Sequence, residues 1–84
     1  MAGVVLLFGR LKDAFGASSI AMPEGVGTAA ELRAILAAEN PELAETILAR
    51  TVRIAVNHEM VADEAATRIS VGDEVALLPP LSGG

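Results

Sequence analysis

The order of hydrophobic and polar positions predicts strands at both ends of the chain and helices in the middle. Residues 4–8, "VVLLF", form a continuous apolar run of strand length, which is typical of a strand buried on at least one face. The next segment, "GRLKDAFG", reads as a turn or a single helical turn between two glycines. A second short strand is expected at residues 18–22, before Pro23.

The clearest helix signal begins at Thr28. Glu31 follows three residues later, at the spacing with which two side chains cap the first turn reciprocally. Leu32, Ile35 and Leu36 then fall on one face, as in a helix that packs on a sheet.

Asn40 and Pro41 end this helix and start a second, shorter one, because Asn caps helices and Pro is tolerated at the first helical position. The second helix is expected to end near Arg50. Its apolar positions are Leu43, Ile47 and Leu48.

The last third of the chain alternates with the period of a half-buried strand over residues 52–56. Asn57 and His58 resemble a hairpin turn, and a short return strand is expected at residues 60–62. A turn at Gly72 and Asp73 then leads into a strand at residues 74–78, which the following proline ends. Such an order predicts an α+β roll, residues 1–78, with one face covered by helix and one exposed.

The expected open face of the sheet follows from the alternation of side chains within the strands. In the last strand Val75 and Leu77 share one side, so Leu78 faces water if the other two pack under the helix. The first strand is apolar on both sides, and Met60 is expected to add to the open side. A docking patch is therefore inferred. The alternative is that loops cover these residues.

Charge and composition narrow the choice of partner. The chain of 84 residues has a formal net charge of −5, which disfavours nucleic acid and anionic membranes and favours a basic partner. Two phenylalanines are its only aromatic residues, which also argues against binding single-stranded nucleic acid. Hydrophobic residues make up 52% of the chain, enough for a core with some apolar surface left over.

The chain lacks most of the residues needed for a zinc site, a thiol nucleophile or a Ser-His-Asp triad, since there is no cysteine and His58 is the only histidine. We therefore expect no metal and no permanently bound cofactor, and we expect His58 to be an exposed turn residue. The apolar run near the start is too short to span a bilayer and has no basic lead-in, so no targeting is expected. A cytoplasmic location fits the absence of cysteine.

Residues 79–84, "PPLSGG", form the predicted tail, which can reach roughly 20 Å at about 3.3 Å per residue. Pro79 and Pro80 keep its base extended, and Gly83 and Gly84 make its tip thin enough for a narrow channel. A terminal carboxylate becomes a useful electrophile once it is adenylated by ATP, after which a sulfur donor or an amine can displace AMP. An inert tail is the alternative.

Three segments, "LFGRLKDAFG", "RIAVNHEMV" and "VGDEVALLPPLSGG", resemble the ubiquitin-like small subunits of molybdopterin synthase, sulfur carriers of the MoaD/ThiS family. The match in order and spacing extends across nearly the whole chain. The resemblance implies a β-grasp fold: a mixed sheet of about five strands, one main helix on one face and a flexible Gly-Gly tail.

The resemblance also implies the chemistry. An E1-like enzyme would use ATP to adenylate Gly84, and sulfur transfer would convert it to a thiocarboxylate. The tail would then enter the synthase large subunit, in a heterotetramer, and give sulfur to cyclic pyranopterin monophosphate to build the molybdopterin dithiolene. Nucleotide contact would occur at the activating enzyme, and the chain would be non-catalytic alone.

By the same resemblance, Gly83 and Gly84 are the functional end. The implied partner-binding residues are Phe8, Met60, Leu78, Pro79, Pro80 and Leu81. The chain departs from the family in having Leu77 and Leu78 where two aromatics are common.

Other functions remain open. Carriers for thiazole, cysteine or tRNA thiolation share the fold and tail, although the two prolines and the length favour molybdopterin. A protein modifier attached to lysines and a plain interaction domain are further alternatives. Lys12, the only lysine, reads as a solvated turn residue, with a partner contact as the alternative.

Overall fold

The computed structural model describes residues 3–70 and 72–80, and a five-stranded sheet runs through the middle of that region. In the strand order β2-β1-β5-β3-β4, the β1–β5 pair is parallel and the other three pairs are antiparallel. The strands are β1 (Val4–Leu7), β2 (Ser19–Ala21), β3 (Arg53–Val56), β4 (Glu59–Met60) and β5 (Glu74–Leu78). The sheet is therefore mixed, as the family resemblance implied.

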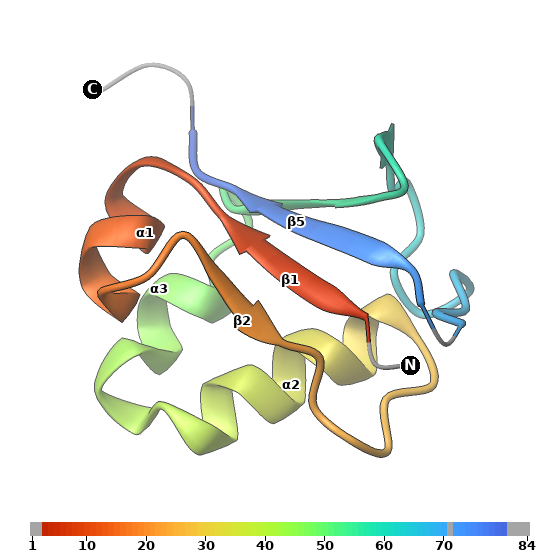
Figure 1. Ribbon diagram of the computed structural model, residues 1–84, viewed down its shortest axis with the longest axis horizontal. Coiled ribbons are helices and arrows are strands. Elements are labelled where there is room, and N and C mark those ends of the chain that lie inside the picture. The colour runs from red at the N-terminus through yellow and green to blue at the C-terminus, as the bar shows by residue number, and fades with distance from the viewer. Residues whose placement is uncertain (1–2, 71, 81–84) are drawn as a thin grey trace.

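Helices cover one face of this sheet (Figure 1). They are α1 (Gly9–Phe15), α2 (Ala29–Glu39), the 3-10 turn η1 (Pro41–Leu43) and α3 (Ala44–Leu48). α2 crosses under the sheet with α3 beside it, and α1 lies at one end. Within the described residues no helix covers the opposite face, which confirms the predicted α+β roll of the β-grasp type.

The core lies between the sheet and α2. It is made of apolar side chains that are almost completely buried, each of which stabilises the fold by roughly 1.5–3 kcal/mol when it leaves water. The largest of them are Val5, Leu7, Leu11, Leu32, Leu36, Ile47, Ile54, Val75 and Leu77.

The predicted cap at the start of α2 is confirmed. The Thr28 hydroxyl accepts a hydrogen bond from the Glu31 amide at 3.2 Å, and the Glu31 carboxylate accepts from the Thr28 amide at 3.0 Å. The same carboxylate accepts from the Gly27 amide at 2.8 Å. Since free amides at a helix start otherwise lack partners, the cap fixes the first residue of α2.

The segment after β1 differs from its prediction. It forms a seven-residue helix, α1, instead of a turn or single helical turn, and Gly16 closes it in the left-handed conformation at φ 74°. The strand ends at Leu7 because Phe8 already serves as the helix N-cap with an extended backbone. Leu11 and Phe15 explain the longer helix, since residues four apart share a face and both pack against the core.

The second predicted helix is also different. A 3-10 turn precedes α3, which ends at Leu48, two residues before Arg50. Ile47 is buried as predicted, but Leu48 is 53% exposed. Successive helical residues point about 100° apart, so a helix this short can direct only one of the two into the core.

Around the predicted hairpin, the turn is confirmed and the strand bounds are corrected. Asn57 and His58 have positive φ angles of 51° and 74°, which is the geometry of a two-residue hairpin turn that matches strand twist. The return strand β4 covers Glu59–Met60 instead of residues 60–62. β2 is likewise shorter than its predicted range, whereas β5 has the predicted bounds.

Candidate functional site

Alternate side chains of the strands point to the core and to the open face of the sheet, as the sequence predicted. In β5, Val75 and Leu77 are fully buried against the helices, and Leu78 lies on the other side, half-buried. In β1 the open side includes Phe8, just beyond the strand, which is 45% exposed. Met60 in β4 is 53% exposed on the same side. Loops of the described chain therefore do not cover these residues.

Two small residues create a hollow in the middle of this face. Ala55 and Ala76 are register partners in the β3–β5 pair, and their short side chains form the floor of a hollow of about 260 Å³. The wall consists of larger residues, with polar ones at one end: Leu6, Phe8, Met60, Leu78, His58 and Glu74. Ala55 points to the open side of β3, yet it is only 6% exposed because it lies at the bottom of this hollow.

A larger hollow of about 660 Å³ adjoins the first where β5 ends. It is lined by Phe8, Gly9, Thr51, Arg53, Met60, Leu78, Pro79 and Pro80. The structure thus brings together five of the six predicted partner-binding residues around one hollow. Leu81, Gly83 and Gly84 lie outside the described residues, and their roles stay predictions.

The base of the tail packs on the start of α1. Gly9 has a φ of 56°, and a Cβ atom placed there would lie 3.0 Å from Cγ of Pro79. A side chain at this position would be strained by the backbone and crowded by the proline. In the sequence Gly9 is only the first residue of the segment between two glycines, and nothing local indicates that Pro79 approaches it.

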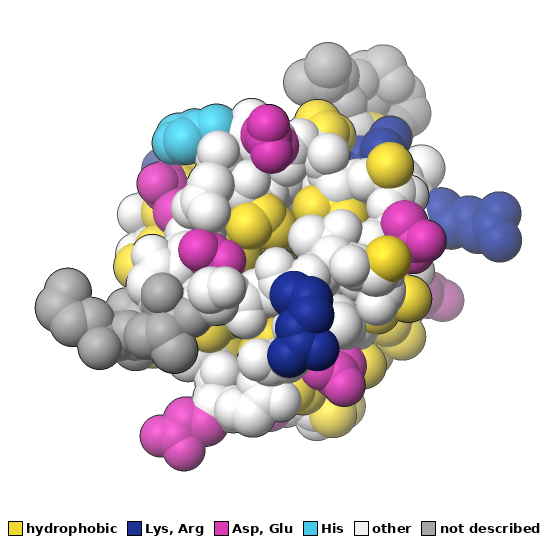
Figure 2. Space-filling view, turned by 90° about the vertical axis from the view of Figure 1, so that its right-hand side faces the viewer, with side chains coloured by type: hydrophobic (Ala, Val, Ile, Leu, Met, Phe, Trp, Pro, Cys, Tyr) yellow, Lys and Arg dark blue, Asp and Glu magenta, His cyan; other side chains and the backbone are white. Residues whose placement is uncertain are grey.

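The opposite end of the open face is polar. Nε2 of His58 lies 3.5 Å from Oε1 of Glu74, and the His58 side chain is 83% exposed, which confirms it as an exposed turn residue. The histidine is visible at the edge of Figure 2, where acidic side chains are spread over the surface. Lys12 is exposed as well, although it lies in helix α1 and not in a turn.

A hydrogen-bonded carboxylate fixes the turn that leads into β5. The amide of Ser70 donates to Asp73 at 2.7 Å and the side-chain amide of Asn57 donates at 3.1 Å. These two bonds, the first being the stronger influence, hold the pKa of Asp73 below its ordinary value of 3.8. Asn57 also accepts from the Glu74 amide at 3.0 Å, so the hairpin turn and β5 are held together.

Two further observations concern chemistry and location. Across residues 3–70 and 72–80, no group of three or more His, Cys, Asp or Glu side chains could hold a metal ion. In the same residues no helix has the length and apolar character needed to cross a bilayer.

Arg53 was missed as a residue of this site. The alternation of side chains in β3 places it on the open side, and by its local sequence it is only a polar position between buried ones. The register of the sheet pairs Arg53 with Leu78, which places Arg53 at the base of the tail.

The mixed sheet, the single main helix and the two prolines beside an open apolar face define a ubiquitin-like β-grasp protein. Small archaeal modifier protein 1 of Methanosarcina acetivorans has the same fold, with a TM-score of 0.80 at 22% identity, covering 100% of this chain and 99% of that one. The chain belongs to the ThiS family, whose model matches residues 5–84.

Relatives within this family carry a more specific name. A protein of Dictyostelium discoideum named molybdopterin synthase sulfur carrier subunit is 32% identical over 82 residues, covering 95% of this chain and 93% of that protein. One of the same name from Chlamydomonas reinhardtii is 35% identical over 81 residues, covering 95% of each. The predicted resemblance is thereby confirmed.

One similar solved structure is a complex of two different subunits. A chain in the complex of subunits 1 and 2 of the molybdopterin-converting factor from Helicobacter pylori is 32% identical, with a TM-score of 0.69. All of this chain and all of that chain are covered.

Proposed function

We propose that this chain is the sulfur carrier subunit of a molybdopterin synthase. The observation that carries the proposal is the hollow at the end of β5, where Phe8, Met60, Leu78 and the two tail prolines meet. An exposed apolar surface at the base of a tail that ends in two glycines suits a protein that docks and delivers its last residue into a partner's active site. Nearly full-length similarity to carriers of that name supports the same conclusion.

In the proposed reaction the chain supplies a carboxylate and its partners supply the catalysis. An E1-like enzyme uses ATP to adenylate the carboxylate of Gly84, with release of pyrophosphate. A sulfur donor then displaces AMP and leaves a thiocarboxylate. The carrier that bears the thiocarboxylate gives this sulfur to cyclic pyranopterin monophosphate. Two carriers used in turn complete the dithiolene of molybdopterin.

The same face serves two partners in this scheme, the activating enzyme and the synthase large subunit. The Helicobacter pylori complex of subunits 1 and 2 supports the second of these partners. Each large subunit is expected to hold one carrier, in a heterotetramer, and the location is expected to be the cytoplasm.

Mass spectrometry tests the chemistry at Gly84. After incubation with the activating enzyme, ATP and a sulfur source, the C-terminal peptide should gain the mass of one oxygen-to-sulfur exchange. A variant with one alanine added after Gly84 should gain none, while a variant with one alanine added before Met1 should react like the parent chain. Molybdopterin formation that persists after deletion of Gly84 would disprove the proposal.

The same samples separate the alternatives. A protein modifier would give isopeptide conjugates that end in Gly84. A carrier for thiazole, cysteine or tRNA thiolation would form the thiocarboxylate but would restore a different pathway in complementation assays.

A further inference from the structure

We propose that the large subunit presents a carboxylate to Arg53, next to an apolar side chain that enters the hollow on the open face. This inference rests on the proposed function, because the partner is taken to be the synthase large subunit. It assigns to Arg53 a role in partner specificity.

The position of Arg53 follows from the register of the sheet. Arg53 is the first residue of β3 and pairs with Leu78, the last residue of β5. Ile54 is fully buried toward the helices, so Arg53 and Ala55 point to the open face. Arg53 therefore borders the larger hollow, and Ala55 forms the floor of the smaller one.

Arg53 is the only charged side chain among the described residues that line the larger hollow; its neighbours there are apolar or neutral. The ion pairs in the described part of the chain are Arg33–Glu64 and His58–Glu74, and neither involves Arg53. Its guanidinium is exposed and has no carboxylate of this region within ion-pair distance.

Docking changes the energetics of this group. A partner that covers Phe8, Met60 and Leu78 also removes water from around Arg53. A guanidinium that loses its water without gaining a partner costs several kcal/mol, so a tight complex requires an acceptor at this point. A carboxylate is the acceptor that matches the planar fork of donors in arginine.

The net charge of the whole chain had favoured a basic partner. That argument applies to the surface as a whole, at distances where individual charges are averaged. At the base of the tail the local charge has the opposite sign because of Arg53. The expected contact is therefore acidic here, whatever the charge of the rest of the partner.

Binding to the large subunit of the source organism, measured by calorimetry at two salt concentrations, tests the proposal. Arg53→Gln should weaken binding about tenfold and Arg53→Glu about a hundredfold, because the first removes the pair and the second adds repulsion. Added salt should weaken binding of the parent chain more than binding of Arg53→Gln. Arg53→Lys should keep part of the affinity.

Arg68→Glu is the matched control, since Arg68 is an exposed arginine that lines neither hollow. It changes the net charge equally and should leave the affinity within about twofold. If Arg53→Glu binds like the parent chain, or if Arg68→Glu weakens binding as much, the role of Arg53 is disproved. Failure of the parent chain to bind would instead disprove the proposed function together with this inference.

A reciprocal substitution provides the strongest support. An Asp→Arg or Glu→Arg variant of the large subunit should restore binding of Arg53→Glu at one acidic position. If substitution by arginine at none of the acidic positions on the docking surface of the large subunit restores binding of Arg53→Glu, the proposed partner carboxylate does not exist. Circular dichroism of each variant checks that it folds. If Arg53→Glu does not fold, the affinity of Arg53→Gln tests the proposal.

Discussion

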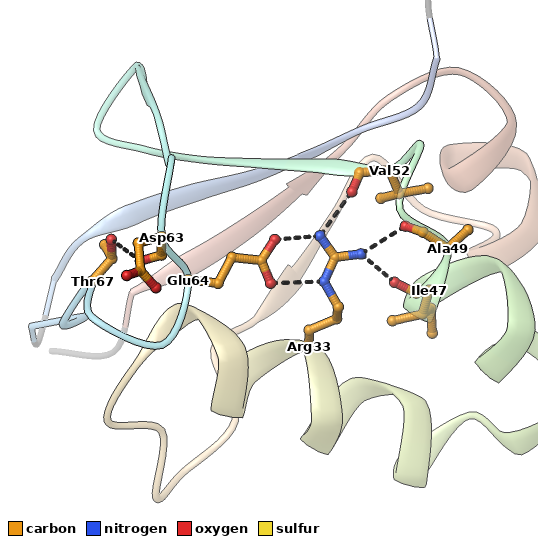
Figure 3. A network of polar contacts seen from close by, with 7 residues as sticks. All are labelled: Arg33, Ile47, Ala49, Val52, Asp63, Glu64 and Thr67. Carbon is orange, nitrogen blue, oxygen red and sulfur yellow. Dashed lines mark hydrogen bonds and ion pairs between the residues drawn. The ribbon is translucent and has the colours of Figure 1, made fainter.

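Arg33 and Glu64, 31 residues apart in the sequence, form a two-pronged ion pair across the molecule (Figure 3). Nε of Arg33 donates to one carboxylate oxygen at 3.0 Å and Nη2 donates to the other at 2.5 Å. Nη1 donates to the carbonyls of Ile47 and Ala49, and Nη2 donates to that of Val52. A single side chain thus joins α2 to the end of α3, to the start of β3 and to the loop before β5.

Replacement of Arg33 by alanine should lower the free energy of unfolding by about 3 kcal/mol, because the half-buried carboxylate of Glu64 and the carbonyls of Ile47 and Val52 lose the guanidinium that donates to them. Urea denaturation measures the loss. Glu64→Gln should cost less, since the bonds to the three carbonyls remain. Arg50→Ala, at an exposed arginine, should change stability by no more than about 0.5 kcal/mol. Equal losses for Arg33→Ala and Arg50→Ala would contradict the assigned role.

Neighbouring leucines on opposite faces of β5 should separate stability from docking. Leu77 is completely buried, so Leu77→Ala should cost about 2–5 kcal/mol of stability. Leu78→Ala should cost about 1 kcal/mol or less and should weaken binding to the large subunit about tenfold. Thermal melts and calorimetry compare the two variants. A Leu78→Ala chain that binds with unchanged affinity would remove Leu78 from the docking surface.

Gly9 should matter for tail position as well as for backbone strain. Gly9→Ala introduces a Cβ close to Pro79, at a positive φ that costs about 1 kcal/mol for alanine. Gly16→Ala is the control, because Gly16 also has a positive φ but no atom within 4 Å of the added Cβ. Both variants should lose similar stability, and only Gly9→Ala should bind the large subunit more weakly. Equal binding by the two variants would show that the Gly9–Pro79 contact does not position the tail.

Asp73 should make the fold sensitive to acid. Its pKa is lowered in the folded chain by the Ser70 amide and, to a lesser extent, by Asn57. A depressed pKa stabilises the fold at pH values above the ordinary 3.8 and stops doing so as the pH falls through the folded-state value. Urea melts between about pH 6 and pH 2.5 should therefore show a larger loss for the parent chain than for Asp73→Asn.

Asp13→Asn serves as the control for this experiment, since Asp13 is an exposed aspartate in α1 whose carboxylate accepts no hydrogen bond from residues 3–70 and 72–80. It should follow the parent chain through the acid range. If Asp73→Asn loses as much stability as the parent chain on acidification, the hydrogen bonds to Asp73 do not couple its proton to folding.

Much of the fold could be predicted because the responsible signals are local. The cap at Thr28, the Asn57–His58 turn and the full extent of β5 each depend on a few adjacent residues. The division of β5 into a buried and an open side was also predicted, since strand residues alternate between faces. Apolar character and the alternation of side chains thus identified Leu78 and Met60 as members of the open face.

Other features depend on which residues become neighbours after folding. Ala55 is buried because larger residues of neighbouring strands wall the hollow in which it lies, and Leu48 is exposed because Ile47 already occupies the contact of α3 with the core. Neither residue carries a local pattern that reveals this. The same limit applies to Arg53, whose importance follows from its register partner Leu78.

The sequence by itself therefore determined the fold class, most of the elements and the apolar character of the docking face, since short-range periodicity and capping dictate these. Only the tertiary structure decided which charged side chains and which backbone segments lie next to that face. It placed Arg53 beside the base of the tail, Pro79 against Gly9, and Arg33 at the junction of four segments. These contacts join residues far apart in the chain, and their partners are set by the packing of the whole sheet against α2.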